Sequence, residues 1–502
     1  MKNKYIYLLI VFLLLLTIPY VISYSLIGRG YHFNGFLINP TDGHSYLAKM
    51  QLGRSGEWLF KLPYSSQPGE GVFLFIYYIV LGHIAGFLHL PNIFLFHVTR
   101  IINSAILFIV LSKLINIYVK ENWSFFTLGL ISFGSGLGWL GLILGLVSSD
   151  FTTPEIYPFL SSLTNPHFPL AIGLMLIIIE ITRDVKPKSV LISTFLSILL
   201  LIIQPFCMVI VLGILGISIL IEYKENIKRK LIQLVSVALP TMTFGIYLYL
   251  ITKNNPALNS WNAQNLTPSP PVWDLLIALS PVILSATFGI ISVIRSKDKT
   301  FYPMVIWVVL VIILAYIPLN LQRRFLIGLY IPICFLGIRG LTVLVEKFSG
   351  KIGKFRNIFF ATAIPTNIIL LFMSLNSVVQ LNPNLVMKES LLTGLKWIDS
   401  NIPARSLVLT SPEIGLYVPA YTNDRVIYGH PYETANAQIN QANVEAFFFG
   451  MNQEEQKEYL AKEGVEYILT MEDKRTGSMN YTPIDSIVVY QIEDVKIYSV
   501  KK

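Results

Sequence analysis

The chain has 502 residues, of which 54% are hydrophobic and only 13% are charged. Soluble domains carry about 25% charged residues, so this composition excludes an ordinary soluble protein. The formal net charge of +9 would suggest nucleic acid as a partner of a soluble chain. Here most basic residues lie in short segments between apolar runs, where cytoplasmic loops carry them, so we expect membrane lipids and no nucleic acid as partners.

Apolar runs of about 20 residues recur through residues 1–380, and each is long enough to cross a bilayer. They predict an α-helical polytopic membrane domain with about 11 transmembrane helices. The first run, about 5–27, is too long for a cleaved signal peptide and lacks a small-residue cleavage site, so we expect an uncleaved span. Lys2 and Lys4 place the N-terminus in the cytoplasm. Cys207 and Cys334 lie in apolar runs and form no metal pattern.

Two later apolar runs need separate interpretation. Residues 71–90 follow the first external loop and precede the next clear span, 94–119; they either cross the membrane or lie along its outer face. The alternation of basic loops favours the second interpretation, a juxtamembrane helix within an external segment 29–93. The long run 190–221 is predicted to divide at Gln204-Pro205, because proline ends or kinks a helix.

Residues 381–502 differ from the rest because apolar and polar residues alternate and charges are frequent. The pattern predicts strands near 406–410, 425–428, 467–470 and 487–490. It also predicts two amphipathic helices, LTGLKWIDSNI and EAFFFGMNQEEQKEYLAKEG. We therefore expect a small extracytoplasmic C-terminal α/β domain, since the last span exits on the outer side.

The polar stretch 29–70 is the first candidate site, because polar residues beside apolar spans tend to mark function. Within it, Asp42 opens an apparent helix and would act as a catalytic general base on an acceptor hydroxyl. The alternative is that Asp42 only caps that helix. His44, Tyr46 and Trp58 are candidate substrate-binding residues nearby, although a tryptophan at this depth is also typical of an interfacial belt.

Further candidates lie in the other external segments. Asp150 is a second catalytic candidate, and Glu155 and His167 are candidate substrate-binding residues. Asp42, Asp150 and His167 could together hold a divalent cation, Mg²⁺ or Mn²⁺; the alternative is that the acids are solvated loop residues. His430 and Glu433 belong to a polar cluster, residues 428–434, that either contacts an acceptor or forms a turn.

Arg323 and Arg324 break the positive-inside pattern, because they lie in a short external loop. Arginine binds phosphate bidentately and is costly to hold near lipid without an anion. The more specific hypothesis is that these arginines bind the headgroup of a polyprenyl phosphate. The alternatives are ordinary lipid headgroups or a pair with Asp150 or Glu155.

This layout resembles the GT-C superfamily of integral membrane glycosyltransferases, in particular its protein mannosyltransferase and aminoarabinose transferase branches. TDGHSYLAKMQLGRSGEW (41–58) is similar to their acidic loop after span 1. GVFLFIYYIVLGHIAGF (71–87), followed by Phe96-His97-Val98-Thr99-Arg100, is similar to their juxtamembrane segment. The paired Asp-x-Asp or Glu-x-Asp of some branches is absent around Asp42 and Asp150.

The resemblance implies a hexosyltransferase that transfers a sugar from a polyprenyl-phosphate donor to an acceptor hydroxyl, with inversion, on the outer face of the plasma membrane. Asp42 would be the catalytic acidic residue, and Arg323 or Arg324 would bind the phosphate. The acceptor could be a glycan, a lipid or a protein. The alternative function is a transporter or flippase of lipid-linked sugars or polysaccharide. Transporters favour polar residues at mid-membrane depth, whereas here they gather on one side, which favours an enzyme.

Overall fold

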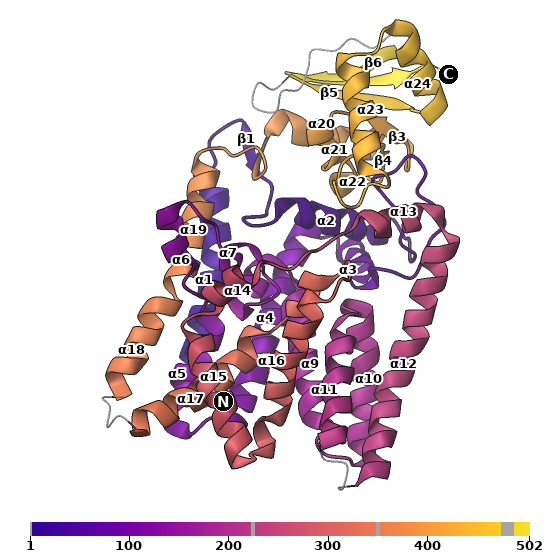
Figure 1. The fold of residues 1–502 in the computed structure, drawn as a ribbon. Helices are drawn as coiled ribbons and strands as arrows, with labels where there is room; N and C mark the ends of the chain where they lie inside the picture. The colour runs from indigo at the N-terminus through magenta and orange to yellow at the C-terminus, as the bar shows by residue number, and fades with distance from the viewer. Residues whose placement is uncertain (1–2, 222–225, 348–351, 473–485, 502) are drawn as a thin grey trace. The chain divides into compact units, whose positions relative to one another are not determined.

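The computed structural model describes residues 3–221, 226–347, 352–472 and 486–501, so Lys2 lies outside the described residues. The chain is mostly helical, with a small sheet region near its C-terminus (Figure 1). Its contacts divide it into two compact units, each assembled from three segments. Unit 1 comprises residues 1–19, 97–246 and 266–374, and unit 2 comprises residues 20–96, 247–265 and 375–502.

Unit 1 is a bundle of apolar helices. Within it α9, α10 and α11 run side by side, and α15 packs along α17 (Figure 1). The predicted division of the run 190–221 is confirmed, because α10 ends at Ile203 and α11 begins at Cys207. The helices that lie wholly or partly in unit 1 are α1 (Asn3–Leu26), α4 (Asn92–Tyr118), α5 (Glu121–Phe133), α6 (Gly138–Gly141), η1 (Leu142–Leu144), α7 (Ser149–Thr152), α8 (Pro158–Thr164), α9 (His167–Ile181), α10 (Pro187–Ile203), α11 (Cys207–Ile221), α12 (Ile227–Asn254), α14 (Val272–Leu279), α15 (Val282–Ser296), η2 (Lys299–Phe301), α16 (Tyr302–Tyr316), η3 (Gln322–Leu326), α17 (Tyr330–Lys347), α18 (Ile352–Ala363) and α19 (Pro365–Val379).

Five helical segments in the described part of the chain are long and apolar enough to cross a membrane, and two bent helix pairs raise the number to seven. The bends are 46° between α5 and the α6–η1 segment and 89° between α14 and α15. Shorter apolar helices include α9, α10, α11 and most of α17. The fold is that of a polytopic membrane protein, as predicted, while the count of about 11 spans stays a prediction.

Unit 2 contains helices α2 and α3, which pack closely. A Cβ at Gly82 would lie 1.8 Å from the carbonyl oxygen of Met50, and one at Gly53 would lie 1.9 Å from that of Ile79. Only glycine permits this approach of two backbones. With 12 residues, α3 is shorter than the roughly 20 that a span requires. The elements that lie mostly in unit 2 are β1 (Tyr31–Phe33), α2 (Pro40–Arg54), α3 (Ile76–Phe87), α13 (Pro256–Gln264), β2 (Val386–Lys388), α20 (Glu389–Asn401), β3 (Leu407–Leu409), α21 (Pro412–Gly415), α22 (Val418–Tyr421), β4 (Arg425–Val426), α23 (Ala437–Phe449), α24 (Gln453–Glu463), β5 (Tyr467–Met471), β6 (Ser486–Ile492) and β7 (Val495–Val500).

A five-stranded sheet of order β4-β3-β5-β7-β6 organises the C-terminal part of unit 2. β3 is parallel to β4 and β5, whereas β7 is antiparallel to β5 and β6. Side chains alternate between two buried clusters, because Val408 packs with the α20 side and Leu407 and Leu409 pack with α23 and α24. A separate pair, β1 and β2, joins Tyr31 to Lys388. The predicted boundary at residue 380 lies near the start of the last segment of unit 2, and the predicted domain division itself stays a prediction.

Candidate functional site

Helix α2 places three polar side chains on one face. Pro40 is the first residue of the helix and Asp42 lies in its first turn. Ser45 and Lys49 follow at spacings of three and four residues, which places them on the same side as Asp42. The N-cap position belongs to Asn39, in the left-handed conformation with φ of 50°. Asp42 therefore lies inside the helix rather than at the capping position.

Lys49 is the most buried charge of this face, with no exposed surface. Its Nζ donates to Glu433 Oε1 at 2.6 Å and Oε2 at 2.8 Å, and to Ser45 Oγ at 2.6 Å. The ammonium also lies 4.3 Å from the ring centre of Phe75 and 5.2 Å from that of Tyr46. Burial opposes ionisation of Glu433, yet Lys49 and His430, with the hydrogen bonds from Lys49 and Ser45, hold the pKa of Glu433 below its usual range.

His430 links this cluster to Asp42. Its Nδ1 accepts hydrogen bonds from the backbone N–H groups of Tyr432 and Glu433, both at 3.1 Å. A neutral histidine in this arrangement carries its proton on Nε2, which lies 3.8 Å from Asp42 Oδ1. Burial lowers the pKa of His430 below its usual range, although Glu433 and Asp42 both favour the charged form. The Asp42 side chain remains 47% exposed. The result is an accessible carboxylate beside a buried N–H donor.

The other predicted residues near Asp42 have structural contacts. His44 is fully buried, its Nδ1 lies 2.7 Å from the carbonyl oxygen of Pro40, and burial lowers its pKa to about 4, partly offset by that hydrogen bond. Tyr46 stacks on Tyr78 with ring centres 4.3 Å apart. Trp58 stacks on His83 at 4.0 Å and is 60% exposed, so it can contact a sugar ring or lipid.

A cavity of about 220 Å³ with a largely apolar lining lies on another side of α2, between residues 48–69 and residues 405–425. Charged side chains line it, among them Lys61, Asp424 and Arg425, together with the ion pair of Glu57 and Arg405. Burial raises the pKa of Asp424 to about 7, and the nearby carboxylates of Asp399 and Glu466 raise it further. Hydrogen bonds from Thr422 and the backbone of Ser406 act in the opposite direction.

In unit 1, Asp150 is buried and holds a loop together. Its Oδ2 accepts hydrogen bonds from the backbone N–H groups of Gly136 at 3.2 Å and Gly138 at 3.1 Å, and from the Thr366 hydroxyl at 2.9 Å. Its Oδ1 has no hydrogen-bond partner within the described residues. These contacts give Asp150 a loop-anchoring role beside the predicted catalytic one.

Glu155 forms an ion pair with Arg323, with 3.5 Å between Oε1 and Nε. Glu155 is almost fully buried, whereas the Arg323 side chain is 38% exposed. The guanidinium of Arg324 lies 5.4 Å from the ring centre of Phe206. His167 is buried at the first residue of α9, with its ring 4.2 Å from that of Phe168. The ion pair of Arg323 with Glu155 is one of the alternatives that the sequence left open.

The residues described here do not form a set of metal ligands. No three side chains of His, Cys, Asp or Glu converge in the described part of the chain. His430 Nε2 faces Asp42 at 3.8 Å, and in the neutral tautomer inferred above this nitrogen carries the proton and has no lone pair to offer a cation. The predicted ligands Asp42, Asp150 and His167 are divided between the two units.

Sequence reasoning selected Asp42, His430 and Glu433 but missed Lys49 and Ser45, which join them. A signal was present, because residues 42, 45 and 49 repeat at helical spacing on one side of the predicted helix. Their importance depends on Glu433, which is 384 residues away from Lys49. No local pattern indicates such a partner.

Comparison with solved structures gives a consistent result for the fold. The apo oligosaccharyltransferase of Archaeoglobus fulgidus has a TM-score of 0.59 at 12% identity, covering 94% of this chain and 70% of that one. ArnT from Cupriavidus metallidurans bound to undecaprenyl phosphate has a TM-score of 0.52 at 10% identity, and the match covers 99% of this chain and 98% of ArnT. The arabinofuranosyltransferase AftD from Mycobacteria has a TM-score of 0.50 at 12% identity, and the match covers 97% of this chain and 40% of AftD.

At these identities the likeness concerns the fold alone. A further structure of the Archaeoglobus enzyme is a complex with Zn and sulfate, and another is a complex with an inhibitory peptide and a dolichol-phosphate. No family model matches the sequence, and no curated protein matches it.

Proposed function

We propose that this chain, which has the fold of the GT-C superfamily of membrane glycosyltransferases, transfers a sugar from a polyprenyl-phosphate donor to an acceptor hydroxyl. The observation that carries the proposal is the half-exposed carboxylate of Asp42 beside the buried Nε2 of His430. The named ligands of similar structures support the donor class, because ArnT was solved with undecaprenyl phosphate and the archaeal enzyme with a dolichol-phosphate.

In the proposed reaction Asp42 acts as general base. Its carboxylate takes the proton of the acceptor hydroxyl while the acceptor oxygen forms a bond to the anomeric carbon. The bond from that carbon to the phosphate oxygen breaks, and polyprenyl phosphate leaves with the electron pair. A single displacement inverts the anomeric configuration. His430 would act as a positioning residue, because its Nε2 lies 3.8 Å from Asp42 Oδ1 and would approach hydrogen-bond distance when the acceptor binds.

Arg323 and Arg324 are proposed to bind the lipid phosphate, and this part of the proposal is tested by itself. The exposed third of Arg323 and the external position predicted for its loop support it. Glu155 would hold the Arg323 side chain in place through the ion pair and would stay paired with it when phosphate binds. Asp150, whose buried Oδ1 has no hydrogen-bond partner among the described residues, is the second candidate for the catalytic residue.

The finer assignments belong to the same proposal. The membrane is the plasma membrane, the N-terminus is cytoplasmic, and residues 381–502 face the outside. The sugar is of hexosyl type, and the acceptor is a glycan, a lipid or a protein. The proposed binding of Mg²⁺ or Mn²⁺ is tested separately by EDTA treatment and re-addition of each ion, because no step above passes through a cation.

The test is sugar transfer by the purified protein from radiolabelled polyprenyl-phosphate sugars. Asp42→Asn keeps the size of the side chain and is expected to lower the rate by about 10² to 10⁴-fold, the usual contribution of a general base. Asp184→Asn makes the same chemical change at a side chain of similar exposure, 54%, outside the proposed site, and is expected to retain activity.

Three outcomes contradict parts of the proposal. Full activity of Asp42→Asn removes the assigned base and makes Asp150→Asn the next variant. Unchanged donor binding in Arg323→Gln and Arg324→Gln removes the phosphate assignment. Donor binding and movement across a vesicle membrane, without transfer or hydrolysis of any donor, establishes the transporter instead.

A further inference from the structure

The cavity of about 220 Å³ in unit 2 lies beside the helix that carries Asp42. Ala48, Gln51 and Leu52 line it from the C-terminal half of α2, whereas Asp42 lies in the first turn of the same helix. At about 1.5 Å per residue, Asp42 and Gln51 are separated by roughly 14 Å along the helix axis. A chain of linked sugar units is long enough to reach both places.

The walls of this cavity suit a ligand with an apolar face and a polar edge. The lining is largely apolar and includes Leu62, Pro63 and Pro419, with a few polar side chains among them. Such a combination is typical of small-molecule sites. A sugar ring has a matching surface, since its C–H faces are apolar and its hydroxyl groups are polar. The volume lies below the roughly 300 Å³ at which sites for drug-sized ligands begin, so the cavity suits a single ring.

The charges in the walls disfavour a strongly charged ligand. Glu57 pairs with Arg405, and Lys61 Nζ lies 3.9 Å from the other carboxylate oxygen of Glu57. An anion would meet the carboxyl groups of Glu57 and Asp424, and a cation would meet Arg405 and Lys61. A neutral ligand that both donates and accepts hydrogen bonds is compatible with these walls, and each hydroxyl group of a sugar does both.

Two amide side chains in the walls have groups that the protein itself does not use. The side chain of Asn423 forms no hydrogen bond with any described residue, although its backbone carbonyl accepts from the Arg405 N–H at 2.8 Å. Gln51 Oε1 accepts from Asn92 Nδ2 at 3.0 Å, while Gln51 Nε2 has no partner among the described residues. These amides can therefore bind hydroxyl groups of a ligand.

Two arginines hold one wall of the cavity in place. Arg425 Nε donates to the carbonyl oxygen of Arg405 at 3.0 Å, and Arg425 Nη1 donates to that of Ser66 at 2.7 Å. Arg405 has a φ of 70°, in the left-handed region that residues other than glycine rarely adopt. Strained backbone of this kind is concentrated at functional sites. A wall fixed in advance also lowers the entropy that is lost when a ligand binds.

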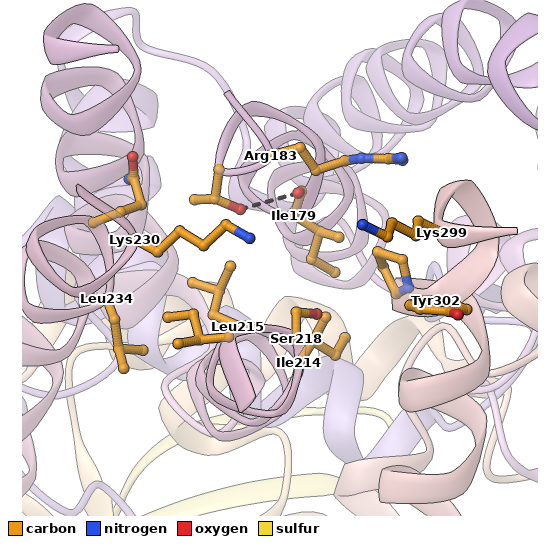
Figure 2. A pocket seen from close by; sticks show the side chains of 13 residues that line it. Ile179, Arg183, Ile214, Leu215, Ser218, Lys230, Leu234, Lys299 and Tyr302 are labelled. Atoms are coloured by element: carbon orange, nitrogen blue, oxygen red, sulfur yellow. Dashed lines mark hydrogen bonds between the residues drawn. The ribbon is translucent and has the colours of Figure 1, made fainter. Parts of the chain in front are cut away.

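The cavity of about 250 Å³ in unit 1 differs, because its polar groups are engaged within the protein. Figure 2 shows Lys230 and Lys299 turned toward its middle, and both interact with other parts of the chain. The Thr182 hydroxyl donates to the carbonyl oxygen of Ile179 at 3.0 Å (Figure 2). The amide of Asn423 in unit 2 has no such contact with the described residues, so the cavity beside α2 carries the inference.

We propose that the cavity beside α2 binds a sugar unit of a glycan acceptor, at a distance from the hydroxyl that reacts at Asp42. The inference rests on the proposed function, because it takes the bound sugar to be part of the acceptor. Asn423 and Gln51 form hydrogen bonds with the sugar hydroxyls, and the apolar walls pack against the ring. An extended peptide is disfavoured, because the Val426 N–H of edge strand β4 already donates to the carbonyl oxygen of Pro63 at 3.3 Å.

The experiment measures the binding of free oligosaccharides to the full-length protein by saturation-transfer NMR, which needs no turnover. Trisaccharides of glucose, mannose and N-acetylglucosamine are titrated beside their monosaccharides and a serine-containing tripeptide. A trisaccharide is expected to bind more tightly than its monosaccharide, because it reaches both the cavity and Asp42. Asn423→Ala should weaken trisaccharide binding about three- to tenfold, as loss of one hydrogen bond does. The matched control is Asn443→Ala, because Asn443 is also half-buried and does not line the cavity.

Trisaccharide binding that Asn423→Ala weakens and Asn443→Ala preserves supports the proposal. Absence of binding by every trisaccharide overturns it, and so does unchanged binding in Asn423→Ala or tighter binding of the tripeptide. If Asn423→Ala does not fold, Gln51→Ala replaces it under the same criteria.

The variant Asp42→Asn separates this inference from the proposed function. It should lose sugar transfer and still bind the trisaccharide. If it binds the trisaccharide and also transfers sugar at the full rate, only the assignment of the base is contradicted. A wild-type protein that transfers sugar through Asp42 but binds no trisaccharide contradicts only the role of the cavity.

Discussion

The ammonium group of Lys49 has no exposed surface and depends on the carboxylate of Glu433 for its charge balance. Removing one partner of such a pair leaves a charge in a medium that solvates it poorly, whereas replacing both with apolar groups of similar size is often nearly neutral. Loss of one partner is therefore expected to change stability strongly, whereas replacement of both partners by apolar residues is expected to change it little.

We expect Glu433→Gln and Lys49→Met each to lower the free energy of unfolding by about 3–5 kcal/mol. The double variant Lys49→Met/Glu433→Leu should recover most of that loss. Thermal unfolding of the purified protein in detergent measures all three, and the double-mutant cycle isolates the coupling. Single variants as stable as the wild type would contradict the burial of an ion pair at this position.

The candidate site could be predicted only in part, and the reason lies in single residues. Asp42 was selected because a carboxylate is conspicuous between apolar spans. Lys49 was not, since a lysine in an external loop is ordinarily solvated, and its burial depends on Glu433 and the rings of Phe75 and Tyr46. Whether the predicted residues have their assigned roles stays a prediction.

At the scale of elements, the α2–α3 contact determines how Asp42 is presented. The two helices approach so closely that the backbone of α3 fills the space where a side chain at Gly53 would lie, and the backbone of α2 does the same at Gly82. α2 carries Asp42, Ser45 and Lys49, so any separation of these helices displaces the polar face of α2.

Gly82→Ala is expected to lower the free energy of unfolding by about 1–3 kcal/mol, the usual range for overpacking, and to reduce sugar transfer. Gly245→Ala is the matched control, because Gly245 also lies in a helix and no heavy atom is within 4 Å of its added Cβ. There alanine should be neutral or slightly stabilising. Equal effects of the two substitutions would show that the close approach is not the cause.

Most elements were predictable, and the exceptions have local physical causes. The strand predicted at 467–470 corresponds to β5 (467–471), and the one at 487–490 lies within β6 (486–492). The helix predicted from 445 to 464 is two helices, because Asn452 and Glu455 form a capping box that starts α24. β1 and β2 were missed since each has three residues and exists through pairing with the other.

Two buried groups make opposite contributions to the pH dependence of the whole molecule. His44 has a pKa of about 4 in the fold against 6.5 when exposed, so the unfolded chain binds more protons and stability falls as the pH falls from 6.5 to 4. Asp424 has a pKa of about 7 against 3.8, so the folded chain binds more protons and stability falls as the pH rises from 3.8 to 7.

We expect the two contributions, each of about 3–4 kcal/mol at 1.36 kcal/mol per pKa unit, to offset each other largely between pH 4 and 6.5. In Asp424→Asn the unfolding temperature should then drop more steeply on acidification than in the wild type. In His44→Gln it should drop less, or rise. Parallel pH profiles of the wild type and both variants would contradict the assignment of these two groups.

Lys49 and Glu433 can pair only late in translation, and this has a consequence for biosynthesis. The two residues are 384 positions apart, and at about 5–20 residues per second a ribosome needs roughly 20 to 80 s to cover that distance. Throughout this interval α2 is already made while its acidic partner does not yet exist. The polar face of α2 is therefore completed near the end of translation, and a nascent chain halted before Glu433 carries a lysine that has to stay in water.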